Sequence, residues 1–137
     1  MKQSNQQWQA RREAAVTPGV GNALQVYIEK ARNAELWDVE GKRYIDFASG
    51  IAVLNTGHNH PKVIQAVSAQ LEKFTHPCFQ VTPYGSYIEL AEKLNQLVPI
   101  NEPTQTLLLS TGAEAVENAI KVARLATGRS AVIAFRG

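Results

Sequence analysis

The strongest constraint on the fold is a change of pattern in the last third of the chain. An apolar run at residues 107–109 gives way to four small residues and then to a helical pattern, in the stretch LLLSTGAEAVENAIKVAR, and AVIAF follows at 131–135. Short, bounded apolar runs are typical of buried strands. The order therefore predicts a strand at 105–110, a helix at 112–127 and a strand at 131–135. Such a βαβ unit requires a parallel strand pair, so we expect an α/β fold in which a mostly parallel sheet begins here.

The turn between the first of these strands and the helix has the residues of an anion site. Thr111 stands three residues before Glu114, which is the spacing of a capping box. Gly112 allows a tight turn and a close approach by a ligand, because it has no Cβ. The free N–H groups of a first helical turn, together with the helix dipole, favour an anion such as phosphate. Most turns of this kind only cap a helix, so the residues of this turn leave both interpretations open.

The first third of the chain predicts a helix followed by an antiparallel meander. Residues 4–15 contain neither Gly nor Pro and begin at Ser4, a good N-cap, so a helix is expected there. Between residues 26 and 47, short β-like runs are separated by Asn33 and by the turn Glu40-Gly41-Lys42. This alternation predicts two or three short antiparallel strands.

Two further helices are expected in the middle of the chain. Pro61 suits the first turn of a helix, where its missing N–H costs nothing, and apolar residues recur at helical spacing up to residue 74. These features predict a helix at 61–74, and a similar pattern predicts one at 84–97. Gly128 is the expected C-cap of the helix that begins at residue 112.

Composition is that of an ordinary soluble domain. The 137 residues are 45% hydrophobic and 19% charged, and the net charge of +2 is spread along the chain, so no nucleic-acid surface is expected. The polar N-terminus lacks the apolar core of a signal peptide, and no apolar run approaches the roughly 20 residues of a membrane span. The single cysteine, Cys78, fits a reducing compartment and is expected to be a partly buried thiol. A cytoplasmic location is the expectation.

Two side-chain groupings admit a chemical and a structural interpretation. His58 and His60 could chelate a metal, but no third ligand lies nearby in the sequence, and His60 could instead cap the helix that begins at Pro61. The structural interpretation is favoured. Glu117 and Lys121 are four residues apart on a helix and are expected to form a surface ion pair. A lysine placed in this way has no reason for a lowered pKa, so no lysine of the chain is expected to be a catalytic amine.

Three stretches together resemble a known family. ELWDVEGKRYIDFASGIAVLNTGHNHPKV, CFQV and STGAEAVENAIKVAR are similar to the N-terminal third of class III pyridoxal-phosphate aminotransferases, and within them to the bacterial enzymes that act on 4-aminobutyrate. The resemblance implies the N-terminal part of a fold-type I transferase. Residues 1–54 would belong to the small domain and interface, and residues 55–137 would begin the large cofactor-binding domain.

The resemblance also implies roles for particular residues. Thr111, Gly112 and Ala113 match the turn that holds the phosphate of pyridoxal 5'-phosphate, although many members have serine where this chain has Ala113. Ile51 and Gln80 match positions that line the substrate pocket. The family works as homodimers with active sites between two subunits.

The reaction implied by the resemblance is transfer of an amino group from 4-aminobutyrate, or a similar ω-amino acid, to 2-oxoglutarate. The lysine that forms the Schiff base lies later in the family than these 137 residues, so no catalytic residue is assigned and the isolated chain is expected to be inactive. Two alternatives remain open: an ornithine-type or acetylornithine-type donor, or a truncated, non-catalytic chain that at most associates with a full-length subunit.

Overall fold

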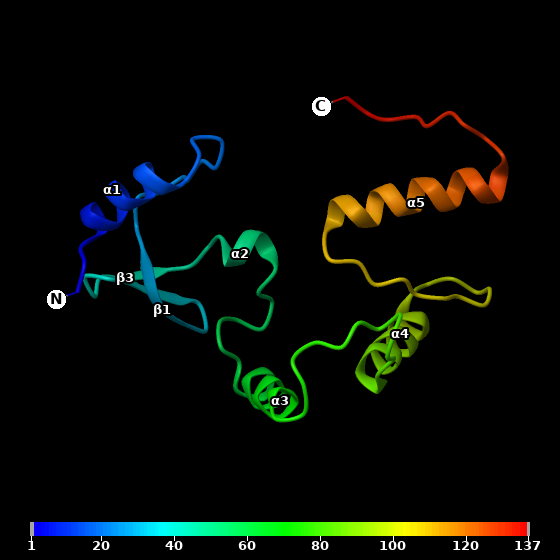
Figure 1. Cartoon of the computed structure of the whole chain (residues 1–137), viewed down its shortest axis with the longest axis horizontal. Coiled ribbons are helices and arrows are strands. Elements are labelled where there is room, and N and C mark those ends of the chain that lie inside the picture. Colours follow the sequence, from blue (N-terminus) through cyan, green and yellow to red (C-terminus); the bar gives the residue numbers. More distant parts are fainter. Residues whose placement is uncertain (1, 137) are drawn as a thin grey trace. The chain divides into compact units, whose positions relative to one another are not determined.

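Helices and a small sheet succeed one another along residues 2–136, which are the residues that the computed structural model describes (Figure 1). The elements are α1 (Asn5–Ala15), β1 (Ile28–Arg32), β2 (Glu35–Asp38), β3 (Arg43–Ile45), α2 (Ser49–Ala52), α3 (Pro61–Leu71), α4 (Gly85–Leu97) and α5 (Gly112–Thr127). The chain divides into two units, Met1–Thr75 and His76–Gly137, and each is described by itself below. The predicted boundary between residues 54 and 55 concerns domains of a complete fold and stays a prediction.

The N-terminal helix α1 begins where the sequence predicts. The Ser4 hydroxyl accepts a hydrogen bond from the N–H of Gln7 over 3.2 Å, and the Gln7 side chain accepts one from the N–H of Ser4 over 2.9 Å. This capping box satisfies two donors that a helix start leaves without partners. The predicted helix and its N-cap are therefore confirmed.

The predicted antiparallel meander is also confirmed. The strands lie in the order β1-β2-β3, and both pairs are antiparallel. The β2–β3 turn contains Gly41 with a φ of 85°, a conformation that glycine adopts without steric cost. The pairing of β1 with β2 is irregular between Ile28 and Lys30, as in a β-bulge.

The buried side chain of the first unit belongs to a polar cluster around Asp38. Asp38 is 1% exposed, whereas no hydrophobic side chain between residues 2 and 136 is buried. The Asp38 carboxylate accepts hydrogen bonds from the Asn5 amide (3.0 Å) and the Tyr44 hydroxyl (2.9 Å), and from the N–H groups of Glu40 (3.0 Å) and Lys42 (2.8 Å). Burial alone would raise the pKa of Asp38, but these four donors together hold it below its ordinary value. Asp38 thus fixes the β2–β3 turn and links it to α1.

The middle helices form close to their predicted positions. Helix α3 starts at Pro61 as expected and ends at Leu71, three residues before the predicted end. Helix α4 begins one residue after the predicted start and ends at the predicted residue. His60 is the N-cap residue of α3, as expected, but its side chain makes no capping hydrogen bond and its Nδ1 atom is buried without a partner.

The two predicted strands around α5 are not strands in this structure. Residues 105–110 and 131–135 have no strand assignment, and within residues 2–136 the sheet described is the antiparallel one, so the predicted parallel pair is absent there. A strand needs hydrogen-bonding partners in a neighbouring strand. Here the N–H of Leu108 donates instead to the Tyr87 hydroxyl over 3.2 Å. The first of these apolar runs still lies against α5, since Leu107 and Leu109 line a groove with Ala119.

Helix α5 matches its predicted bounds. Gly128 follows it in the left-handed conformation, with φ 68° and ψ 7°, and its N–H donates to the carbonyl of Arg124 over 2.9 Å. Glu117 and Lys121 form the expected ion pair at 2.6 Å. Among residues 2–136, no helix combines the length and apolar character that crossing a membrane would require.

Candidate functional site

The turn that opens α5 is held by a reciprocal pair of side-chain hydrogen bonds. The N–H of Glu114 donates to the Thr111 hydroxyl oxygen over 3.1 Å, and the Glu114 carboxylate accepts from the N–H of Thr111 over 3.0 Å. The Thr111 hydroxyl also lies 3.2 Å from that carboxylate. The predicted capping box is therefore confirmed, and it fixes the backbone of the two residues in between.

Those two residues leave donors available for an anion. Gly112 and Ala113 are the first two residues of the 16-residue helix α5. Within the part of the chain that the structure describes, their backbone N–H groups donate no hydrogen bond. An added Cβ at Gly112 would meet no atom within 4 Å. This glycine is therefore required neither by crowding nor by a positive φ, and the space beside it is open. Free N–H groups, a helix dipole and open space together suit a phosphate group.

The predicted substrate residue Ile51 lies in an unusual turn of the first unit. Ser49, Gly50, Ile51 and Ala52 all have positive φ, at 48°, 63°, 62° and 60°. The N–H of Ala52 donates to the carbonyl of Ala48 over 3.0 Å, so α2 is one turn of left-handed helix. A left-handed conformation costs roughly 1–2 kcal/mol for each non-glycine residue. With three such residues, the turn carries about 3–6 kcal/mol of strain, which the surrounding contacts must offset.

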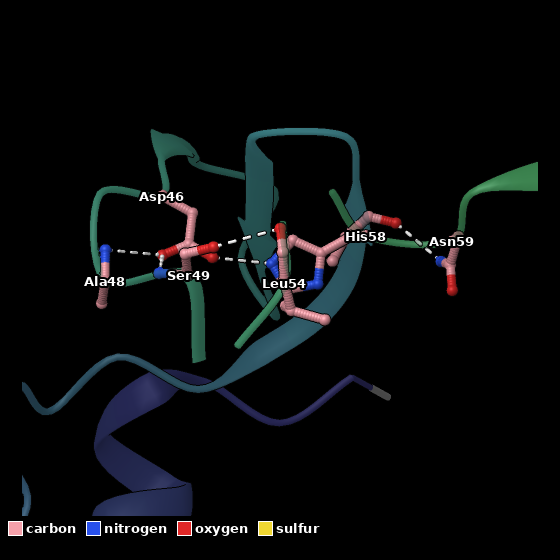
Figure 2. A network of polar contacts seen from close by, with 7 residues as sticks. Asp46, Ala48, Ser49, Leu54, His58 and Asn59 are labelled. Atoms are coloured by element: carbon pink, nitrogen blue, oxygen red, sulfur yellow. Dashed lines mark hydrogen bonds and ion pairs between the residues drawn. The ribbon is translucent and has the colours of Figure 1, made fainter. Parts of the chain in front are cut away.

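A carboxylate anchors this strained turn (Figure 2). Oδ1 of Asp46 accepts hydrogen bonds from the N–H groups of Ala48 (3.0 Å) and Ser49 (2.8 Å), and its Oδ2 lies 2.7 Å from Nε2 of His58. The hydrogen bond with His58 is the main reason why the pKa of Asp46 is held below its ordinary value, and the N–H of Ser49 acts in the same direction. The Ser49 hydroxyl reaches the carbonyl of Leu54 over 3.3 Å and closes the far end of the turn.

His58 is itself fixed to the meander. Its N–H and carbonyl pair with the carbonyl and N–H of Asn33 over 2.8 and 2.9 Å, as an isolated antiparallel bridge. The adjacent Gly57 has a φ of 77°, and a Cβ there would lie 3.0 Å from the Cα of Asn33. Glycine is needed at this close approach. The structure thus gives His58 a role as an anchor that the sequence interpretation did not assign to it.

The predicted substrate residue Gln80 lies in a turn of the second unit. The N–H groups of Val81 and Thr82 donate to the carbonyl of Cys78, and the Cys78 thiol lies 3.2 Å from the Gln80 side-chain oxygen. Cys78 is exposed, so its expected partial burial is wrong. The reason is local, because the thiol points to a polar neighbour and not into an apolar cluster.

An aromatic stack holds this turn. The ring of Phe79 stacks on that of Tyr87 in α4, with centroids 3.9 Å apart and an interplanar angle of 19°. Tyr84 packs edge-on against Phe79 at 5.5 Å. Edge-on pairs such as that of Phe79 and Tyr84 are favourable. Gln80 is therefore presented from a turn whose neighbouring residue is packed on α4.

The five candidate residues are distributed over both units. Thr111, Gly112 and Ala113 are consecutive at the start of α5 in the second unit, which also contains Gln80. Ile51 lies in the first unit and is 92% exposed. The structure brings the three phosphate candidates together at one helix start, and their roles remain predictions.

Comparison with known proteins defines the class. The chain belongs to the class-III aminotransferases, because the model of that family matches residues 15–137. It therefore carries part of the fold-type I architecture of these pyridoxal-phosphate-dependent enzymes. The family predicted from the three sequence stretches is confirmed.

Individual relatives are similar over nearly the whole chain. The 5-aminovalerate aminotransferase DavT of Pseudomonas aeruginosa is 58% identical over 137 residues, which cover 100% of this chain and 32% of DavT. The 4-aminobutyrate aminotransferase GabT of Escherichia coli is 55% identical over 134 residues, covering 98% of this chain and 32% of GabT. Among solved structures, the ornithine aminotransferase of Toxoplasma gondii is 30% identical to this chain, with a TM-score of 0.77. The match covers 90% of this chain and 28% of that enzyme, whose active site holds pyridoxal phosphate at partial occupancy. The chain thus spans about a third of the length of these relatives.

Proposed function

We propose that these residues supply the phosphate-binding turn and part of the substrate wall of an aminotransferase that uses pyridoxal 5'-phosphate. The enzyme would move an amino group from an ω-amino acid, such as 4-aminobutyrate or 5-aminovalerate, to 2-oxoglutarate. The observation that carries the proposal is the capped start of α5, where two backbone donors are free beside an open glycine.

The roles of the turn residues follow from their contacts. The N–H groups of Gly112 and Ala113 would donate to phosphate oxygens, with the helix dipole adding to the attraction. Thr111 has its hydroxyl engaged with Glu114, so its part is to hold the two donors in place. Ala113 offers its N–H alone, where a serine would add a hydroxyl. When bound, the cofactor supplies the electron sink for the chemistry, and the protein supplies orientation and charge.

The proposed substrate wall uses Ile51 and Gln80. The exposed, branched hydrocarbon side chain of Ile51 suits the methylene chain of an ω-amino acid, since apolar contact there removes hydrocarbon from water. The Gln80 amide offers both a donor and an acceptor for the polar end of a substrate. We also propose a cytoplasmic homodimer with active sites between its subunits.

The relatives favour one class of amino donor over another. A short ω-amino acid is favoured because the relatives named for 4-aminobutyrate and 5-aminovalerate are 55–58% identical. The ornithine-type alternative has weaker support, since the ornithine aminotransferase is 30% identical. These two classes of donor differ in that ornithine carries an additional α-amino group.

The test is a donor comparison with the complete protein that contains this sequence. Formation of glutamate from 2-oxoglutarate is measured with 4-aminobutyrate, 5-aminovalerate, ornithine and N-acetylornithine at equal concentrations, with and without added pyridoxal phosphate. We expect kcat/KM to be highest for one of the two ω-amino acids and activity to depend on the cofactor. A clear preference for ornithine or acetylornithine would replace the donor assignment, and absence of transamination with all four would refute the function.

A further inference from the structure

We propose that Asp46 and His58 are positioning residues that set the direction of the Ile51 side chain through the left-handed turn Ser49–Ala52. This inference rests on the proposed function, in which Ile51 is part of the substrate wall. It adds to that function a clamp, made of the Asp46 carboxylate and the His58 ring, that determines how the donor is recognised.

The turn requires an external constraint because its own packing does not supply one. Ile51 is 92% exposed, so burial of its side chain does not hold the backbone at a φ of 62°. Left-handed backbone is especially unfavourable for a β-branched residue. The backbone hydrogen bonds within the turn, such as that from the N–H of Val53 to the carbonyl of Ser49 at 2.9 Å, could equally form in a right-handed turn. The left-handed conformation of the turn must therefore be stabilised by contacts at its ends.

Asp46 makes those contacts at the start of the turn. Its Oδ1 atom accepts the N–H groups of Ala48 and Ser49, which fixes the orientation of the two peptide planes that lead into the left-handed residues. Its Oδ2 atom is held by the His58 ring (Figure 2), at a distance of 2.7 Å. The Asp46 side chain is only 7% exposed. A carboxylate with both oxygens engaged has little freedom to rotate and so transmits the position of His58 to the turn.

His58 connects this carboxylate to a rigid element. Its backbone pairs with Asn33 at the end of the β1–β2 hairpin, and the neighbouring Asn59 amide donates to the carbonyl of Ala31 in β1 over 2.9 Å. The connection therefore runs from the strand pair through the His58 ring and Asp46 to the turn. Sites held by such supporting contacts on strands are more precise than sites on free loops.

Loss of the clamp should alter donor recognition more than cofactor binding. In Asp46→Ala, the turn is free to leave the left-handed conformation, and the Ile51 side chain then points elsewhere. We expect KM for the preferred ω-amino donor to rise about tenfold, which corresponds to 1.4 kcal/mol, while the affinity for pyridoxal phosphate changes less than about twofold. His58→Ala should act in the same direction.

A double-mutant cycle in the complete protein separates positioning from general destabilisation. If Asp46 acts through Ile51, Asp46→Ala should change the donor KM by less than about twofold in an Ile51→Ala background, because no side chain remains to be positioned. Asp46→Asn, which keeps an oxygen for Ala48 and Ser49, should restore most of the donor affinity. The matched control for Asp46→Ala is Asp38→Ala, the same change at the other anchoring carboxylate of this unit, for which no change of donor KM is expected.

The outcomes distinguish this inference from the function on which it rests. If Asp46→Ala raises the donor KM equally with Ile51 present and in the Ile51→Ala background, the clamp is refuted and the aminotransferase function stands. An unchanged donor KM in Asp46→Ala would have the same meaning. An unchanged donor KM in Ile51→Ala would overturn the role of Ile51 and the clamp together. If Asp46→Ala does not fold, the same cycle is measured with His58→Ala, which removes the ring that holds Asp46, and equal effects in the two backgrounds would again refute the inference.

Discussion

Substitution of Gly112 by alanine should change protein stability and cofactor binding in opposite directions. At this position an added Cβ meets no atom within 4 Å, and the backbone does not need glycine for its φ. Replacement of glycine by alanine at a compatible site stabilises a protein by about 0.4–1 kcal/mol, because it restricts the unfolded chain. The cofactor-free Gly112→Ala protein should therefore be as stable as the original or slightly more stable.

Cofactor binding should nevertheless weaken. Cα–Cβ bonds of a helix tilt toward its N-terminus, so the new methyl group would project toward the space beside the free N–H groups of Gly112 and Ala113. A displaced phosphate would lose one hydrogen bond to a charged group, which is worth about 1.5–3 kcal/mol. This corresponds to an affinity for pyridoxal phosphate that is about ten- to a hundredfold lower.

The measurements are urea unfolding of the cofactor-free protein and titration with pyridoxal phosphate followed by its absorbance. Gly21→Ala is the matched control, because Gly21 is also a glycine with no atom within 4 Å of a Cβ, and it lies outside the proposed site. Undiminished cofactor affinity in Gly112→Ala would refute the phosphate assignment. A loss of stability greater than about 1 kcal/mol in cofactor-free Gly112→Ala would show that the fold itself requires glycine at this position.

Two further predictions concern capping and acid stability. Thr111→Ala removes the side-chain cap of α5 and should lower the unfolding free energy, measured by urea titration, by about 0.5–2 kcal/mol. Thr111→Ser keeps a hydroxyl and should be close to the original protein. An equal loss of stability in both variants would contradict a capping role for the hydroxyl. Because the pKa values of Asp38 and Asp46 are lowered in the folded state, their contribution to stability is present above their ordinary value of 3.8 and is lost as the pH falls through the lowered values. Unfolding free energy measured from pH 5 downward should therefore fall less steeply in Asp38→Asn than in the original protein, and parallel curves would refute this linkage.

Features set by local sequence could be predicted well. The capping box of Thr111 and Glu114, the left-handed Gly128 and the hairpin turn at Gly41 each depend on a few adjacent residues, and each was expected from them. The strands at 105–110 and 131–135 depend on partners elsewhere, so an apolar run alone could not decide whether a ladder forms. Leu108 illustrates this, since its N–H finds a side-chain hydroxyl as its acceptor.

The supporting contacts of the candidate site were largely beyond sequence reasoning. Asp38 precedes the turn at Gly41, and an aspartate in that place is a usable signal for side-chain bonding to turn N–H groups. The pairing of Asp46 with His58 spans 12 residues and has no such signal. The left-handed turn was equally hidden, because in its sequence only Gly50 suggests positive φ. Ile51 was assigned by resemblance, and its backbone conformation came from the structure alone.

The pairing order of the small sheet bears on how the protein is made. Each strand pairs with its neighbour in the chain, β1 with β2 and β2 with β3. Such pairing closes short loops, which costs little chain entropy and is fast. Ribosomes add only about 5–20 residues per second, so the hairpins and the bridge from Asn33 to His58 can form while residues 105–135 are still being synthesised. The nascent chain would therefore already hold the Ile51 turn in place before the phosphate-binding turn leaves the ribosome.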